Sequence, residues 1–231
     1  MRLESFDAIY HRAAERKGGE SILNSMISTP LETQEIASLA DDRVLSAFTK
    51  KVFQSGFVWR VIEQKWPDFE EVFFGFDVEK VLLMPDEMLE QKSTDKRIVR
   101  NYKKVMTVRD NALMLSDIAR SHGSFGAFAN TYSADNIIEL WAYLKKHGAR
   151  LGGNTGPYAL RTLGIDTFLL SRDVEGYFRQ HDLISGSATS KRSLTAINAA
   201  FIEWQKQSDW SLQSLSQLVS LSCGDNYRLG E

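Results

Sequence analysis

Apolar residues recur along this chain at the three- and four-residue spacing of amphipathic helices. One such stripe runs from Ile137 through Trp141 to Leu144 and ends at Gly148. Short runs in which apolar and polar positions alternate, as they do in half-buried strands, are scarce. The hydrophobic pattern therefore predicts an all-α fold.

Capping residues and helix breakers divide this pattern into segments. Asp and Ser are preferred just before a helix, proline is tolerated in its first turn, and glycine often follows its end. On these grounds we expect helices over residues 5–27 with a break at Gly18 and Gly19, 30–39, 42–53, 58–64, 67–75, 77–83, 85–89, 95–120, 137–147, 155–163, 173–180, 189–205 and 212–221.

Composition narrows the possible classes of protein. The single cysteine, Cys223, excludes an internal disulfide, and the four scattered histidines show no metal-ligand spacing. No apolar run approaches the length of a membrane span, and the charged N-terminal segment does not resemble a signal peptide. We therefore expect a cytoplasmic protein with no membrane partner.

A net charge of −2 means that any nucleic-acid surface must be local. Basic residues do cluster, in the segment 92–109 and again in the segment 145–150. Each cluster is equally compatible with an ordinary solvated helix face. Arg100, Lys103, Lys104 and Arg150 are the candidate phosphate contacts, because they flank the motifs described below.

A glycine-rich turn separates the two predicted helices 137–147 and 155–163. Glycines allow backbone N–H groups to approach an anion closely, and the start of a helix adds positive potential. The turn therefore predicts a site for a DNA phosphate, and a monovalent cation could bind there as well. The alternative is a plain helix terminator, because glycine commonly follows a helix. The candidate residues are Gly148, Arg150, Gly152, Gly153 and Thr155.

Asp173 follows Thr155 by 18 positions and stands at the head of a predicted helix. This spacing resembles that of helix-hairpin-helix DNA glycosylases, in which a catalytic aspartate follows the hairpin at a helix start. The alternative is that Asp173 only caps its helix. Asp166 is a competing carboxylate, but it comes too soon after the hairpin to be the first choice.

A more specific resemblance covers residues 42–173 in one consistent order. The chain resembles the DNA-3-methyladenine glycosylase I family in the segments 56–62, 65–69, 74–77, 80–81, 98–105, 111–112 and 151–155, and at Tyr158. Each motif alone is weakly specific, so the argument depends on their collinearity. The resemblance implies two helical lobes around a cleft, extrusion of a damaged base from duplex DNA and hydrolysis of its N-glycosidic bond.

The resemblance also divides the chain and assigns base-binding residues. Within a single domain, 1–231, we expect a central lobe over 42–133 and a hairpin-bearing lobe formed by 1–41 with 134–231. Trp59 matches the family's base-stacking tryptophan, and core packing is the alternative. Tyr10 matches a pocket tyrosine that precedes a zinc-ligand histidine. The predicted base-binding set is Trp59, Tyr10, Lys51 and Tyr158.

Three departures from the family pattern matter. Lys51 stands where the family has a glutamate that hydrogen-bonds the methylated base. The resemblance therefore does not determine which damaged base is released. The paired cysteines and histidines of the usual zinc site are missing, so we expect no zinc and no other cofactor. Asp173 restores a superfamily carboxylate that the family lacks.

Asn154 occupies the position at which lyase-type members of the superfamily carry a Schiff-base lysine. We therefore predict a monomeric, monofunctional glycosylase that acts on double-stranded DNA carrying an alkylated base similar to 3-methyladenine. The main alternative is a non-catalytic DNA-binding or damage-sensing protein. A helical protein with no role on DNA is a third interpretation.

Overall fold

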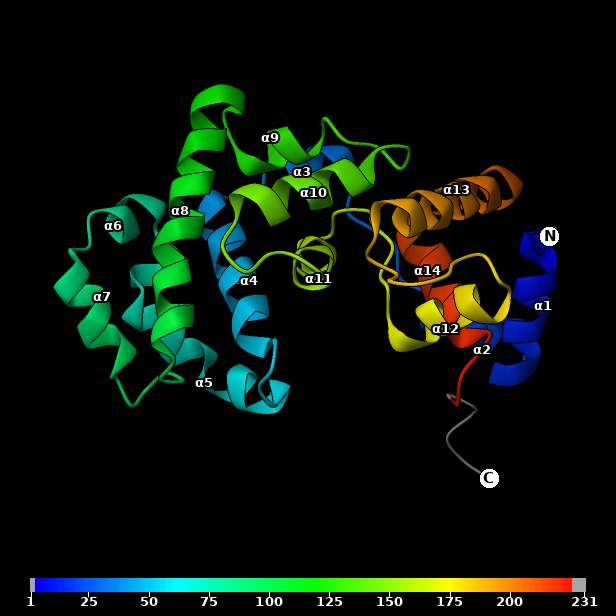
Figure 1. Cartoon of the computed structure of the whole chain (residues 1–231), viewed down its shortest axis with the longest axis horizontal. Coiled ribbons are helices and arrows are strands. Elements are labelled where there is room, and N and C mark those ends of the chain that lie inside the picture. The colour runs from blue at the N-terminus through cyan, green and yellow to red at the C-terminus, as the bar shows by residue number, and fades with distance from the viewer. Residues whose placement is uncertain (1–2, 226–231) are drawn as a thin grey trace. The chain divides into compact units, whose positions relative to one another are not determined.

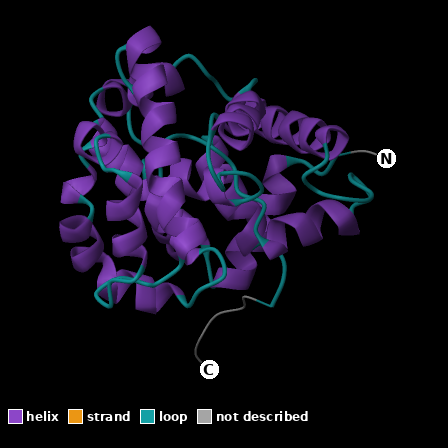
Figure 2. Ribbon diagram, turned by 60° about the vertical axis from the view of Figure 1, so that its left-hand side comes forward, coloured by secondary structure: helices purple, strands orange, loops and turns teal. Residues whose placement is uncertain are grey.

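The computed structural model describes residues 3–225, and every regular element within them is a helix (Figure 2). The all-α prediction is confirmed. Figure 1 follows the helices along the chain: α1 (Phe6–Lys17), α2 (Glu20–Met26), α3 (Thr33–Ala37), α4 (Asp41–Gln54), α5 (Trp59–Val72), η1 (Phe74–Phe76), α6 (Val78–Leu82), α7 (Asp86–Ser93), α8 (Tyr102–His122), α9 (Phe125–Ala129), α10 (Ile137–His147), α11 (Thr155–Thr162), α12 (Arg172–Gln180), α13 (Lys191–Ser208) and α14 (Leu212–Leu221).

Helix α5 replaces the two separate helices expected over 58–64 and 67–75. Pro67 lies inside this helix and cannot donate a hydrogen bond to the preceding turn. The buried stripe of Ile62, Phe69 and Val72 nevertheless continues across the proline. Tertiary packing of this stripe keeps the helix continuous despite the missing bond.

Helix α8 begins later than the expected helix over 95–120. Asn101 has extended backbone angles, and its side-chain oxygen accepts a hydrogen bond from the Lys104 N–H at 3.1 Å. An asparagine that caps in this way marks the first turn of a helix. Residues 95–100 therefore form the connection to α8 rather than its start.

The chain divides into two compact units. The first, called here the hairpin unit, comprises Glu32–Tyr132 and Glu139–Leu163, and the second, the terminal unit, comprises Met1–Leu31, Ser133–Ile138 and Gly164–Glu231. These boundaries differ from those drawn on the sequence, because the segment 139–163 groups with the central helices. Its helix α11 packs against α4.

Each unit has its own core. In the hairpin unit α4 contacts α5, α8 and α11 around buried rings that include Phe48, Phe53 and Phe69. In the terminal unit α14 contacts α1, α12 and α13, and Phe201 and Trp204 are fully buried. Between residues 3 and 225 no helix combines the length and apolarity needed to cross a membrane.

Candidate active site

A small cavity opens in the hairpin unit where α4 ends and where α5 and α11 begin. Its volume is ≈ 160 Å³. This is below the roughly 300 Å³ at which pockets for drug-sized ligands begin. The residues that line this cavity, called here the Trp59 cavity, are Lys51, Gln54, Ser55, Trp59, Asn154, Thr155 and Tyr158. Three of the four predicted base-binding residues therefore line one cavity.

Trp59 provides an aromatic wall of this cavity. It is the first residue of α5, and the residue is 51% exposed. Tyr158, from the first turns of α11, meets it edge to face, with ring centroids 6.1 Å apart and an interplanar angle of 88°. The alternative of core packing is wrong for Trp59, because a core indole would not be half open to solvent.

Lys51 reaches the cavity from the last turn of α4. Its Nζ lies 4.9 Å from the centroid of the Trp59 ring and donates a hydrogen bond to Gln54 Oε1 at 2.9 Å. Burial lowers the pKa of Lys51, the nearby charge of Lys50 lowers it further, and Glu63 acts in the opposite direction. A cation at this place gives the cavity a donor of hydrogen bonds where a carboxylate would give an acceptor.

The hairpin joins this cavity through Asn154 and Thr155, the latter being the first residue of α11. Arg150 and Gly153 both have a φ of 60°, a conformation that is uncommon for a residue with a side chain. The Gly156 N–H donates to the Leu151 carbonyl at 3.1 Å and closes the turn. The turn places exposed backbone at Gly153 next to the start of a helix.

A buried asparagine holds the hairpin in place. The Asn111 side chain, 0% exposed, accepts from the Ala149 N–H at 2.8 Å and donates to the Ala149 carbonyl at 3.2 Å. This two-point contact fixes the turn against α8. The predicted hairpin residues Gly148, Arg150, Gly152, Gly153 and Thr155 thus belong to one braced loop that could receive a phosphate oxygen.

Lys104 does not fit the role of a phosphate contact that the sequence suggested. It is only 6% exposed, and its Nζ donates to the carbonyls of Val52 at 2.8 Å, Phe53 at 3.3 Å and Ser55. These carbonyls end α4 and have no helical partners of their own. Burial lowers the pKa of Lys104, and Arg150 adds to this effect. Lys104 is a structural cap for α4.

Replacing Lys104 by methionine is expected to destabilise the fold by about 2–3 kcal/mol, because several buried carbonyls lose a charged donor. Urea unfolding followed by circular dichroism measures the change. Lys103→Met is the matched control, since Lys103 is the exposed neighbour on the same helix. Equal stability of the two variants would contradict the capping role.

Arg100 and Lys103 are exposed at the start of α8, as a phosphate contact requires. Both remain predictions.

Asp173 lies in the terminal unit, in the first turn of α12. Ser171 is the residue that caps this helix, through a 3.2 Å bond from the Val174 N–H to its hydroxyl. The interpretation of Asp173 as only a cap is therefore wrong. Its Oδ2 accepts from the Ser220 hydroxyl at 3.4 Å, and it lines a hollow of ≈ 430 Å³ beside Cys223.

Asp166, the competing carboxylate, has a structural role. Its two oxygens accept from the N–H groups of Leu212 and Gln213 at 3.1 and 2.8 Å. These are the first two residues of α14, whose N-terminal N–H groups need such partners. Asp166 thus holds the start of α14.

Tyr10 belongs to an aromatic cluster of the terminal unit. Its ring stacks on Phe6 at 5.8 Å, meets Trp210 edge-on at 5.9 Å, and its hydroxyl donates to Asn24 Oδ1 at 3.3 Å. The neighbouring His11 is exposed. The base-binding role of Tyr10 stays a prediction.

Comparison with known proteins decides the family. The sequence profile described as methyladenine glycosylase matches residues 36–159, more than half of the chain. The chain belongs to the methyladenine glycosylase family. The match contains α4, α5 and the hairpin, and so includes every residue that lines the Trp59 cavity.

Two solved structures are similar to this chain. The Staphylococcus aureus 3-methyladenine DNA glycosylase I, whose 3-methyladenine recognition has been described, is 21% identical over 68% of this chain and 91% of its own, with a TM-score of 0.49. A Methanocaldococcus jannaschii 8-oxoguanine glycosylase/lyase, solved with a 15mer DNA containing 8-oxoguanine, is 14% identical over 92% of this chain and 95% of its own, with a TM-score of 0.55. The comparison with curated proteins gave no match. As a methyladenine glycosylase with this all-helical fold, the protein is a DNA glycosylase of alkylated bases.

Gln54 is a cavity residue that the sequence did not single out. It is 2% exposed, and it accepts from Lys51 while its Nε2 donates to Glu63 Oε1 at 2.8 Å. Lys50 Nζ holds the other oxygen of Glu63 at 2.6 Å. The i, i+3 spacing of Lys51 and Gln54 on one helix was the available indication.

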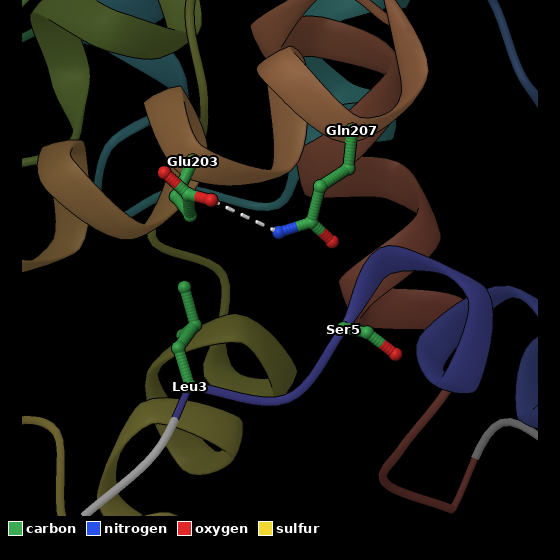
Figure 3. Close-up of a pocket in the computed structure, with 4 residues that line it drawn as sticks. All are labelled: Leu3, Ser5, Glu203 and Gln207. Carbon is green, nitrogen blue, oxygen red and sulfur yellow. Dashed lines mark hydrogen bonds between the residues drawn. The ribbon is translucent and has the colours of Figure 1, made fainter.

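This methyladenine glycosylase also has a larger hollow in its terminal unit (Figure 3). Its volume is ≈ 680 Å³, and Leu3, Ser5, Glu203 and Gln207 line it. Gln207 Nε2 donates to Glu203 Oε1 at 3.3 Å, and Gln207 Oε1 accepts from the Phe6 N–H at 2.8 Å. Among the described residues its lining offers no aromatic face for a base.

Within residues 3–225 no three His, Cys, Asp or Glu side chains are grouped so that they could hold a metal ion. Cys223 is half-buried, and burial raises the pKa of its thiol. The charge of Asp173 raises this pKa further. A thiol in that state is a poor metal ligand, because metals bind the thiolate.

Proposed function

We propose that this protein is a monofunctional DNA glycosylase that extrudes an alkylated base from duplex DNA into the Trp59 cavity and hydrolyses its N-glycosidic bond. The observation that carries the proposal is the direct junction of an aromatic cavity with the glycine hairpin inside one compact unit. The hairpin holds a backbone phosphate while the cavity holds the base of a neighbouring nucleotide.

Asp173 supplies the carboxylate of the reaction. As the bond from C1′ to the base breaks, the electron pair leaves with the base and the sugar becomes an oxocarbenium ion. The negative charge of Asp173 stabilises this cation, and its oxygen takes a proton from the water that bonds to C1′.

No lysine stands at the hairpin position that would attack C1′, because that residue is Asn154. The DNA strand therefore stays intact after the base is released. We further propose that the protein works as a monomer, with no resident zinc, and that a monovalent cation can share the hairpin with the phosphate.

Incubation with short duplexes, each carrying one alkylated base, tests the proposal. Released bases are identified by mass spectrometry, and abasic sites are revealed by alkaline cleavage. We expect base release without strand cleavage and without a borohydride-trapped adduct. Tight binding of the duplexes with no base release would instead identify a non-catalytic damage sensor. An adduct would overturn the monofunctional assignment.

A further inference from the structure

The Trp59 cavity is positively charged, which is unexpected for a site that would receive a cationic base. Of its seven described lining residues, Lys51 is basic and none is acidic. An alkylated purine such as 3-methyladenine carries a positive charge while it is attached to DNA.

A hydrogen-bond chain fixes the ammonium at this place. Glu63 accepts from Gln54 at 2.8 Å, and Gln54 in turn accepts from Lys51 at 2.9 Å. Lys50 pairs with Glu63 at 2.6 Å, so the negative charge of Glu63 is already balanced. Lys51 itself donates to the neutral amide of Gln54, and this bond uses one of the three N–H donors of its ammonium.

The Trp59 ring attracts a cationic base less strongly than its exposure suggests. The Lys51 ammonium lies 4.9 Å from the ring centroid and already makes the cation–π contact. A second positive charge in the same cavity is repelled by the first at short range. A neutral base stacks on the indole without this cost.

We infer that Lys51 makes this cavity selective for neutral alkylated purines that present a hydrogen-bond acceptor, and against cationic ones. The inference rests on the proposed glycosylase function and names its substrate class. The free N–H groups of Lys51 would donate to a ring nitrogen or carbonyl oxygen of the extruded base.

The chemistry of the leaving group agrees with this selectivity. A cationic base leaves as a neutral molecule and needs no stabilisation. A neutral base takes the electron pair of the broken bond and becomes negatively charged until it gains a proton. An ammonium that donates to its edge stabilises this developing charge, and the proton that water loses at C1′ finally balances the base.

Single-turnover base release from two alkylated adenines tests the inference on the full chain. One substrate is a duplex with 1,N6-ethenoadenine, which is neutral and has an acceptor nitrogen, and the other is methylated DNA that contains cationic 3-methyladenine. The variants are Lys51→Met, which keeps the aliphatic stem, and Lys51→Glu. Lys80→Met is the matched control, because Lys80 is an exposed lysine of the same unit that pairs with Asp77 and does not line the cavity.

We expect Lys51→Met to slow release of ethenoadenine about tenfold to a hundredfold, as for loss of a hydrogen bond to a charged group. Release of 3-methyladenine should not fall, and Lys51→Glu should raise it. Lys80→Met should leave the preference between the two lesions unchanged. Circular dichroism melting and binding of an uncleavable 2′-fluoro ethenoadenine duplex establish that the variants fold and bind.

Other outcomes separate the two proposals. If the wild type releases only 3-methyladenine, or if Lys51→Met affects both lesions equally, the selectivity inference fails while the glycosylase function stands. If the wild type binds both DNAs and releases neither base nor any other alkylated base, the proposed function itself fails, and the inference with it.

Discussion

Asp173→Asn is expected to lower base release about a hundredfold to ten-thousandfold, the range over which a positioned acid or base contributes to catalysis. The amide keeps the shape of the side chain and can still accept from Ser220. It carries no negative charge to stabilise an oxocarbenium ion, and it takes no proton from water. Single-turnover release measures the loss, and fluorescence anisotropy should show nearly unchanged DNA affinity.

Glu175→Gln is the matched control for Asp173. Glu175 lies on the same helix, and its carboxylate is paired with Arg179 at 2.6 Å near the surface. This variant should release bases at close to the wild-type rate, because an exposed pair of this kind contributes little. If Asp173→Asn were as active as Glu175→Gln, the catalytic carboxylate would have to be sought elsewhere.

The helical fold could be predicted because its evidence is local. Stripes such as Ile137, Trp141 and Leu144 are visible in the sequence, and their burial in α10 follows from that spacing. Helix ends were harder to predict. Pro67 looked like the start of a new helix, but the buried stripe on either side of it decides the outcome, and that burial depends on packing partners far away in the chain.

Much of the lining of the Trp59 cavity could also be predicted, through the collinear motifs rather than through any one residue. Lys51, Trp59 and Tyr158 come from segments far apart in sequence, and the structure brings them together because α11 packs against α4. Resemblance to a family predicts which distant segments lie together, whereas the period of the hydrophobic pattern does not. Gln54 escaped notice because its spacing from Lys51 marks only a helical neighbour, and its hydrogen bond to Glu63 on the next helix is known only from the folded chain.

Charged residues were the least predictable part of the site. Lys104 and Lys103 are adjacent in the sequence and have the same chemistry, yet one is buried against the end of α4 and the other is exposed. Asp166 and Asp173 were both candidate carboxylates, and only the structure assigns Asp166 to the start of α14. Which side of a helix meets a neighbour decides these roles, and that information is not local.

Trp59→Ala is expected to weaken binding of an extruded base about fivefold to a hundredfold, the range for loss of one aromatic stacking partner. Affinity for the unmodified duplex should hardly change, because a base that remains in the helix does not reach the cavity. Binding of uncleavable lesion-containing and unmodified duplexes measures the two affinities. Trp59→Phe should recover most of the loss, since a smaller ring still stacks.

Two controls distinguish base stacking from other roles of Trp59. Val58→Ala removes the exposed apolar neighbour, which does not line the cavity, and should leave the preference for damaged DNA unchanged. Because Trp59 is 51% exposed, loss of its side chain should change the melting temperature little. A large drop in melting temperature would indicate that Trp59 stabilises the fold, and an equal loss of affinity for both duplexes would make Trp59 a general DNA contact. Only a loss confined to the damaged duplex agrees with an indole on which the extruded base stacks.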